Sequence, residues 1–133
     1  MNAKPFLDTN ILVYAFASND PRSEQAEALL AAGGMISVQV LNEFVNVARR
    51  KLRREWAEIE DALGVLRAIL DPPIAVTVAL HETAVSLTRD VGFSFYDSLI
   101  IAAAIRAGCP VLYSEDLQDG QIVHGVRFRN PFG

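Results

Sequence analysis

The chain has 133 residues, of which 51% are hydrophobic, and its 12 basic and 16 acidic side chains give a formal net charge of −4. This length predicts a single domain over residues 1–133 that can bury a hydrophobic core. The composition excludes a membrane-spanning helix, which needs roughly 18 apolar residues, and the single cysteine, Cys109, excludes an intramolecular disulfide. No secretory signal is visible, so we expect a soluble cytoplasmic protein with no membrane partner.

In the first half of the chain, short apolar runs alternate with stretches whose apolar residues recur at helical spacing. In chain order we expect a strand at 6–7, a helix at 11–16, a helix from Asp20 to about Gly33, a strand at 35–38 and a helix around 40–48. Asp20 before Pro21 is typical of the N-cap and first residue of a helix, and Gly33 is typical of a helix end.

The second half continues this alternation. We expect a long helix at 56–70, a β-branched strand at 74–78, a helix at 80–91, a helix whose segment 99–105 is wholly apolar, and strands at 111–113 and 126–128. Strands that alternate with helices form parallel sheets covered on both faces. The predicted fold class is therefore α/β, a three-layer α/β/α sandwich with a mostly parallel sheet of four to five strands.

Four acidic residues lie where this fold would carry chemistry. Asp8 ends the first apolar run, just before the first helix, and therefore lies at the carboxyl end of a strand. In open parallel sheets, the crevice beyond the carboxyl ends of the strands is where ligands bind. Glu43, Asp97 and Asp116 lie at points where the chain returns toward that crevice. These four acids form one candidate site.

Each acid also has a simpler interpretation. Asp8 could act only as a helix cap, Glu43 could be exposed on its helix, and Asp97 fits the last position of an S/T-x-x-acid capping box. Asp116 and Asp119 follow a strand, where acidic residues are common in turns. The residues by themselves leave these interpretations open.

Several carboxylates in one crevice would repel one another and raise each other's pKa. A hard divalent cation relieves this repulsion, and Mg²⁺ prefers oxygen ligands while it retains several waters. Such a site can activate water and stabilise an anionic phosphoryl transition state. His81 and His124 have no ligand spacing that would indicate zinc.

A basic segment interrupts the acidic chain. Five of the twelve basic residues fall within six positions, and they are Arg49, Arg50, Lys51, Arg53 and Arg54. The net charge argues weakly against a nucleic-acid partner, but a local basic patch can still bind phosphates. The other interpretation is a solvated helix end, because cations are favoured at the negative pole of a helix.

Four motifs together resemble the PIN domain family. They are Phe-Leu-Asp-Thr-Asn-Ile-Leu at 6–12, Asn-Glu-Phe at 42–44, Tyr-Asp-Ser-Leu at 96–99 and Ser-Glu-Asp-Leu at 114–117. Within the family the chain looks like the VapC toxins of bacterial toxin–antitoxin modules. The resemblance implies a PIN-like fold, an endoribonuclease that uses Mg²⁺ or Mn²⁺, an RNA substrate, inhibition by a cognate antitoxin and assembly as a homodimer.

The resemblance also implies roles for individual residues. The family's acidic positions, which hold the metal and carry the catalysis, correspond to Asp8, Glu43, Asp97 and Asp116. Thr9 and Ser114 match the hydroxyls that support these acids. The fourth acid varies in the family, so Asp119 could share or take the role of Asp116.

Two other function classes share some of these features. A phospho-accepting receiver domain has a similar length and strand alternation, but it would need an aspartate after its third strand and a lysine near its fifth. Here Ala79-Leu80-His81 follows the third predicted strand, and no lysine occurs after Lys51, which argues against this class. A PIN-like module that binds RNA or a partner without catalysis stays open, although the intact acids speak against it.

Overall fold

The computed structural model describes residues 3–133, and in this part of the chain four strands form one sheet in the order β1-β2-β4-β3. β1 (Phe6–Leu7) pairs in parallel with β2 (Val111–Tyr113), and β2 pairs in parallel with β4 (Val126–Arg129). The edge strand β3 (Ile122–Val123) runs antiparallel to β4. The predicted mostly parallel sheet is confirmed.

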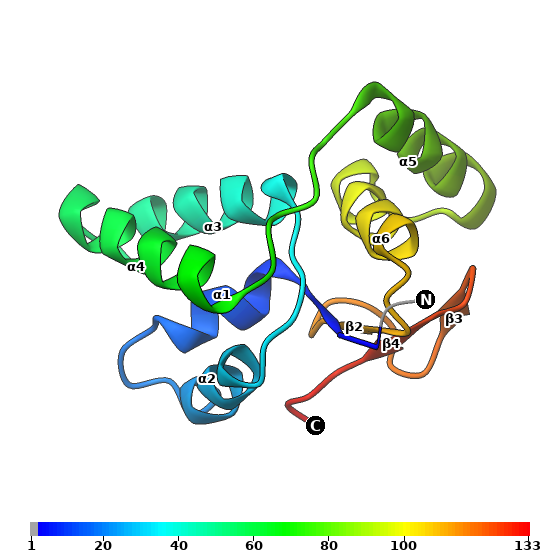
Figure 1. The fold of residues 1–133 in the computed structure, drawn as a ribbon. Coiled ribbons are helices and arrows are strands. Elements are labelled where there is room, and N and C mark those ends of the chain that lie inside the picture. The colour runs from blue at the N-terminus through cyan, green and yellow to red at the C-terminus, as the bar shows by residue number, and fades with distance from the viewer. Residues whose placement is uncertain (1–2) are drawn as a thin grey trace.

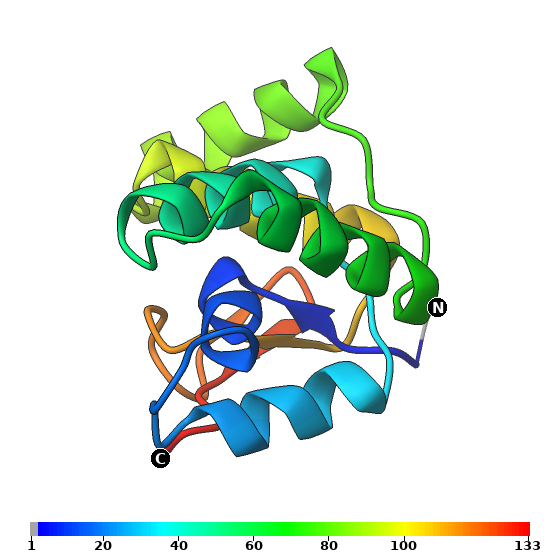
Figure 2. The ribbon, with the colours of Figure 1, turned by 90° about the vertical axis from the view of Figure 1, so that its left-hand side faces the viewer.

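Helices cover both faces of this sheet. They are α1 (Thr9–Ala15), α2 (Ser23–Ala31), α3 (Val38–Arg50), α4 (Trp56–Ile69), α5 (Val78–Val91) and α6 (Phe95–Ala107) (Figure 1). Figure 2 shows α2 below the sheet and α3, α4, α5 and α6 above it. This layering confirms the predicted three-layer α/β/α class. No helix in the described residues is long and apolar enough to cross a membrane.

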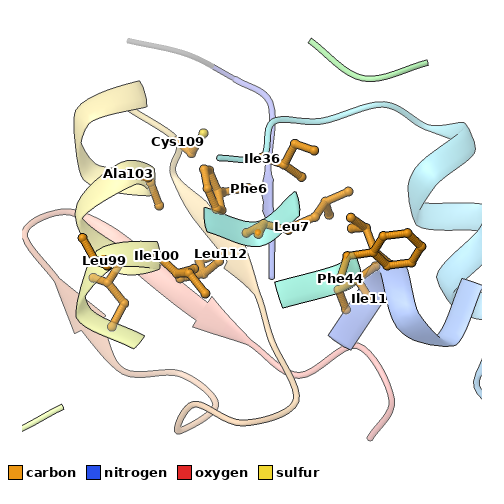
Figure 3. Packing of buried hydrophobic residues seen from close by; sticks show 14 of the residues in the cluster. Phe6, Leu7, Ile11, Ile36, Phe44, Leu99, Ile100, Ala103, Cys109 and Leu112 are labelled. Carbon is orange, nitrogen blue, oxygen red and sulfur yellow. The ribbon is translucent and has the colours of Figure 1, made fainter. Parts of the chain in front are cut away.

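The hydrophobic core surrounds β1. Phe6 and Leu7 are fully buried in its middle, with Leu99 and Ile100 of α6 on one side and Phe44 of α3 on the other (Figure 3). The apolar segment of α6 explains why residues 98–104 of this helix are all buried. Because β1 is enclosed in this way, the residue that follows it emerges at the edge of the core.

The prediction of strands at 35–38 and 74–78 is wrong. Their sheet pairing consists of two isolated parallel bridges, Phe6 with Met35 and Ser37 with Ile74. Ser37 is the N-cap of α3, and its hydroxyl accepts a hydrogen bond from the Val40 amide at 3.3 Å. Thr77 caps α5 in the same way. These caps begin helices before either extended segment can continue its pairing.

Two further details differ from the sequence prediction. α2 begins at Ser23, because Asp20 does not cap the helix and instead accepts a hydrogen bond from the Arg22 amide at 2.8 Å. Strand β3 has only two residues, which is too short for an alternating pattern to reveal. It is held by a two-residue turn in which His124 and Gly125 both have positive φ, as tight hairpins require.

Candidate active site

Asp8 stands between β1 and α1 and joins the sheet to the candidate site. Its Oδ1 accepts a hydrogen bond from the Thr9 amide at 2.7 Å, so Asp8 is the N-cap of α1. Its Oδ2 accepts a hydrogen bond from the Ser114 hydroxyl, also at 2.7 Å. Asp8 is only 4% exposed. Asp8 is therefore both the cap of α1 and a buried carboxylate at the carboxyl end of β1.

The surroundings of Asp8 disfavour its negative charge. Burial raises the pKa of Asp8 from 3.8 to about 7, against the opposing effect of the hydrogen bonds from Ser114 and Thr9. The negative charges of Glu43 and Asp97 raise this pKa further. Two of the other predicted acids therefore repel the charged form of Asp8, and a cation at this place would relieve that repulsion.

Glu43 is held by two neighbouring side chains. The Thr9 hydroxyl donates to Oε1 at 2.9 Å, and Gln39, one turn earlier on α3, donates through Nε2 to Oε2 at 3.0 Å. The residue is half-buried, so it is not the freely exposed side chain that the simpler interpretation assumed. Thr9 links the two acids, because its amide binds Asp8 and its hydroxyl binds Glu43.

Asp97 lies in the first turn of α6. The Ser94 hydroxyl accepts a hydrogen bond from the Asp97 amide at 3.2 Å, which is one half of a capping box. Among the described residues, the carboxylate of Asp97 accepts no hydrogen bond from Ser94 or from any other group. Its capping contact is therefore made by the backbone and not by the carboxylate.

The segment after β2 brings Asp116 to the site. The Ser114 hydroxyl accepts a hydrogen bond from the Asp116 amide at 3.1 Å, and Asn10 Nδ2 donates to Asp116 Oδ2 at 3.2 Å. Asp119 lies elsewhere: it is exposed, and its Oδ1 accepts a hydrogen bond from the Asn130 amide at 2.9 Å. Asp119 serves a turn, whereas Asp116, which is also exposed, lines the same cavity as Glu43.

A cavity of about 530 Å³ is lined by two of the four predicted acids, Glu43 and Asp116, whereas Asp8 and Asp97 do not line it. Its lining comes from α1, from α3 and the residue after it, and from the segment after β2, and consists of Thr9, Asn10, Val13, Tyr14, Glu43, Asn46, Val47, Lys51 and Asp116. A smaller, more apolar cavity of about 150 Å³ contains none of the predicted acids. The chemistry of the lining favours the larger cavity as the candidate active site.

The donor set fits a hard divalent cation in its chemistry. Asp8, Glu43, Asp97 and Asp116 offer carboxylate oxygens, and the raised pKa of Asp8 marks a place where positive charge would stabilise the fold. Among residues 3–133, no three Asp, Glu, His or Cys side chains are gathered closely enough to enclose an ion.

Two members of the basic segment, Arg49 and Arg54, make contacts within the protein. Arg54 donates through Nη2 to the Phe16 carbonyl at 2.7 Å and to the Ser18 hydroxyl at 3.0 Å, which ties the end of α1 to the α3–α4 connection. The guanidinium of Arg49 lies over the Trp56 ring, 5.1 Å from its centroid. These contacts are structural.

The other three basic residues are exposed. Lys51, which follows the last residue of α3, lines the acidic cavity. Arg50 and Arg53 do not line it. The basic segment therefore contains side chains in different environments, and Lys51 is the member that reaches the candidate site.

Comparison with known proteins shows the family of this chain. The family model described as the PIN domain matches residues 6–118, which include all four acids. The chain belongs to the PIN domain family. No curated protein matches the sequence.

Solved structures share the fold of this PIN domain. VapC20 of Mycobacterium tuberculosis, described as a toxin that cleaves the sarcin–ricin loop, is 23% identical over 84% of this chain and 91% of its own, with a TM-score of 0.70. A toxin–antitoxin complex from Klebsiella pneumoniae is 21% identical over 98% of both chains, with a TM-score of 0.72. VapBC2 of Rickettsia felis, bound to promoter DNA, is 22% identical over 95% and 97%, with a TM-score of 0.68.

Sequence reasoning missed polar residues that organise the acids of this PIN domain. Asn10 donates to Asp116, and its Oδ1 accepts a hydrogen bond from the Glu115 amide at 3.2 Å. Gln39 supports Glu43, and Tyr14 lines the cavity. Gln39 lies four residues before Glu43, a spacing that places the two on one helix face. No comparable signal links Asn10 to residues more than a hundred positions away.

Proposed function

We propose that this PIN domain is a metal-dependent endoribonuclease and the toxin component of a VapBC-type toxin–antitoxin module. The observation that carries the proposal is the buried Asp8, whose raised pKa reflects burial and the charges of Glu43 and Asp97, beside a polar cavity. Known toxins with the same fold support it. We propose that the protein acts in the cytoplasm.

In this proposal Asp8, Glu43, Asp97 and Asp116 hold Mg²⁺ or Mn²⁺. The cation, when bound, supplies Lewis-acid activation of water and stabilises negative charge on the phosphoryl group. The protein's own part is to hold the acids: Thr9 fixes Glu43, and Ser114 fixes Asp8. Asp119 supports the turn that follows.

The proposed substrate is RNA. Lys51 lines the acidic cavity and offers a positive charge where a phosphate next to the cleaved bond would lie. Arg50 and Arg53 are exposed beyond the cavity and are proposed to contact phosphates further along the strand. Arg49 and Arg54 already have intramolecular contacts, so we assign them a smaller part in RNA binding.

The proposed partners are a cognate antitoxin and a second copy of the chain. The smaller cavity, lined by apolar residues such as Phe16, Phe44 and Ile59, lies between α3 and α4 and could receive an apolar side chain of an antitoxin helix. Trp56 on α4 is 52% exposed, which extends the apolar surface available there. Relatives with this fold occur in complexes described as toxin–antitoxin and VapBC.

The test is incubation of the purified protein with total cellular RNA, in Mg²⁺ and in EDTA, followed by mapping of the new RNA ends. We expect discrete new ends in Mg²⁺ and none in EDTA, and the Asp8→Asn variant should produce none in either. RNA binding without any metal-dependent cleavage would contradict the proposal and favour the non-catalytic PIN-like module.

A further inference from the structure

A cluster of charged and aromatic side chains adjoins the candidate site and shares Tyr14 with it. Arg22, the N-cap residue of α2, donates through Nε and Nη2 to the two carboxylate oxygens of Asp20, at 3.0 Å each. Its Nη1 donates to Glu115 Oε1 at 2.8 Å and to the Tyr14 hydroxyl at 2.7 Å. The guanidinium carbon also lies 3.7 Å from the centroid of the Tyr14 ring.

The same cluster holds the residue between two members of the site. Glu115 lies between Ser114 and Asp116, and its amide donates to Asn10 Oδ1. Its carboxylate accepts hydrogen bonds from the Tyr14 hydroxyl and from Arg22. Glu115 does not line the cavity, although Asp116 and Tyr14 do. The Glu115 side chain is therefore bound to α1 and to the start of α2, while its neighbour Asp116 lines the cavity.

We propose that Arg22 is a positioning residue that holds Glu115 away from the metal site, so that the segment after β2 presents Asp116 alone. This inference rests on the proposed function in that the cavity is taken as the place where a divalent cation binds. Without the guanidinium, Glu115 would carry an uncompensated negative charge next to Asp116. Repulsion between the two, and competition of Glu115 for the cation, would then displace the acid that the site uses.

The experiment measures Mn²⁺ binding to the RNA-free protein by calorimetry for the wild type, Arg22→Gln, Glu115→Gln and the double variant. Loss of groups that orient metal ligands typically lowers metal affinity by roughly 10- to 100-fold. We expect Arg22→Gln to weaken Mn²⁺ binding by at least about tenfold. Because Arg22 acts through Glu115, the double variant should bind Mn²⁺ better than Arg22→Gln alone, which is a non-additive result.

Arg89→Gln is the matched control. Arg89 pairs with both carboxylate oxygens of Asp90 on α5, at 2.7 and 3.0 Å, but does not line the cavity. This variant should bind Mn²⁺ as the wild type does. Thermal unfolding of every variant in EDTA shows whether the fold is kept. If Arg22→Gln lowers only the unfolding temperature and leaves Mn²⁺ affinity unchanged, Arg22 is a structural residue and the inference is wrong.

Cleavage assays separate this inference from the proposed function. A wild type that binds Mn²⁺ but cleaves no RNA contradicts the ribonuclease proposal and leaves the effect of Arg22 on binding intact. A wild type that cleaves RNA, with an Arg22→Gln variant of equal Mn²⁺ affinity, contradicts only the positioning role. A wild type that binds no Mn²⁺ contradicts the positioning role, because there is then no metal affinity for Arg22 to set.

Discussion

At the scale of single residues, Asp8 combines two tasks that usually fall to different side chains. It caps α1 through the Thr9 amide, and it is a buried carboxylate beside other acids. Capping favours the charged form, because the helix N-terminus is positive, whereas burial opposes that form. Burial is the larger effect, so Asp8 is where protons and cations should compete for the same oxygens.

The first prediction concerns the pH dependence of stability. Because the pKa of Asp8 is raised from 3.8 to about 7 on folding, the metal-free folded chain holds a proton that the unfolded chain releases. Stability from this group is therefore present at low pH and is lost as pH rises from about 4 to about 7, by at most about 1.4 kcal/mol per pH unit.

Urea unfolding in EDTA across this interval, for the wild type and Asp8→Asn, measures the effect. As pH rises through this interval, the unfolding free energy of the wild type should fall steadily relative to that of the variant. A constant difference would mean that Asp8 stays ionised in the folded chain.

The second prediction concerns Asp97. Its amide contact with the Ser94 hydroxyl survives the Asp97→Asn substitution, because the backbone makes it. We therefore expect Asp97→Asn to abolish Mg²⁺-dependent cleavage while the metal-free fold stays at least as stable, since repulsion with Asp8 is relieved. If the variant cleaves RNA normally, Asp97 serves only the first turn of α6 and does not take part in catalysis.

At the scale of elements, the basic residues at the end of α3 and in the α3–α4 connection fall into two groups with different roles. Arg54 binds the Phe16 carbonyl and the Ser18 hydroxyl, and Arg49 stacks on Trp56, so these two stabilise the junction of α1, α3 and α4. Lys51, by contrast, faces the cavity. A contiguous charge run therefore has no single function.

The third prediction follows from this division. Replacing Arg50 and Arg53 by Gln, or Lys51 by Gln, should weaken RNA binding and flatten its salt dependence. Each phosphate of single-stranded RNA that the protein no longer neutralises should reduce the log–log slope by about 0.7. Binding isotherms at several salt concentrations measure this slope.

Arg54→Gln is the contrasting variant for this measurement. It should lower the unfolding free energy by roughly 1 kcal/mol, because it removes hydrogen bonds to the Phe16 carbonyl and the Ser18 hydroxyl. The salt dependence of RNA binding should stay nearly unchanged. If the salt dependence of RNA binding has the same slope in the wild type and in all variants, the basic segment does not contact RNA and is only a solvated helix end.

At the scale of the whole molecule, the proposed antitoxin surface and the candidate active site share one framework. Both cavities are lined by residues of α3 and by residues in or directly after α1. Phe16 and Phe44 line the apolar cavity, and Thr9 and Glu43 line the acidic cavity. A partner bound at the apolar cavity would therefore contact α3, the helix that also carries Glu43.

The fourth prediction concerns this partner. The resemblance to VapC toxins implies an antitoxin that places a basic side chain near the acids, so inhibition and loss of Mg²⁺ binding should occur together. Titration of Mg²⁺ into the free protein and into its complex with the product of the neighbouring reading frame tests this. Equal Mg²⁺ affinity in both, with cleavage still blocked, would show that the partner excludes RNA by steric occlusion.

The sequence by itself determined the helices, the buried α6 and the strand-to-helix position of Asp8, because periodicity, caps and apolar runs are local signals. Its four motifs also predicted the family. Only the tertiary structure decided which polar residues serve the acids, since Asn10 meets Asp116 and Arg22 meets Glu115 through contacts between distant segments. It also separated Lys51 from Arg54, because the environment of a charge depends on what folds against it. Hydrogen-bond partners far apart in the chain have no characteristic spacing, so the sequence alone does not predict them.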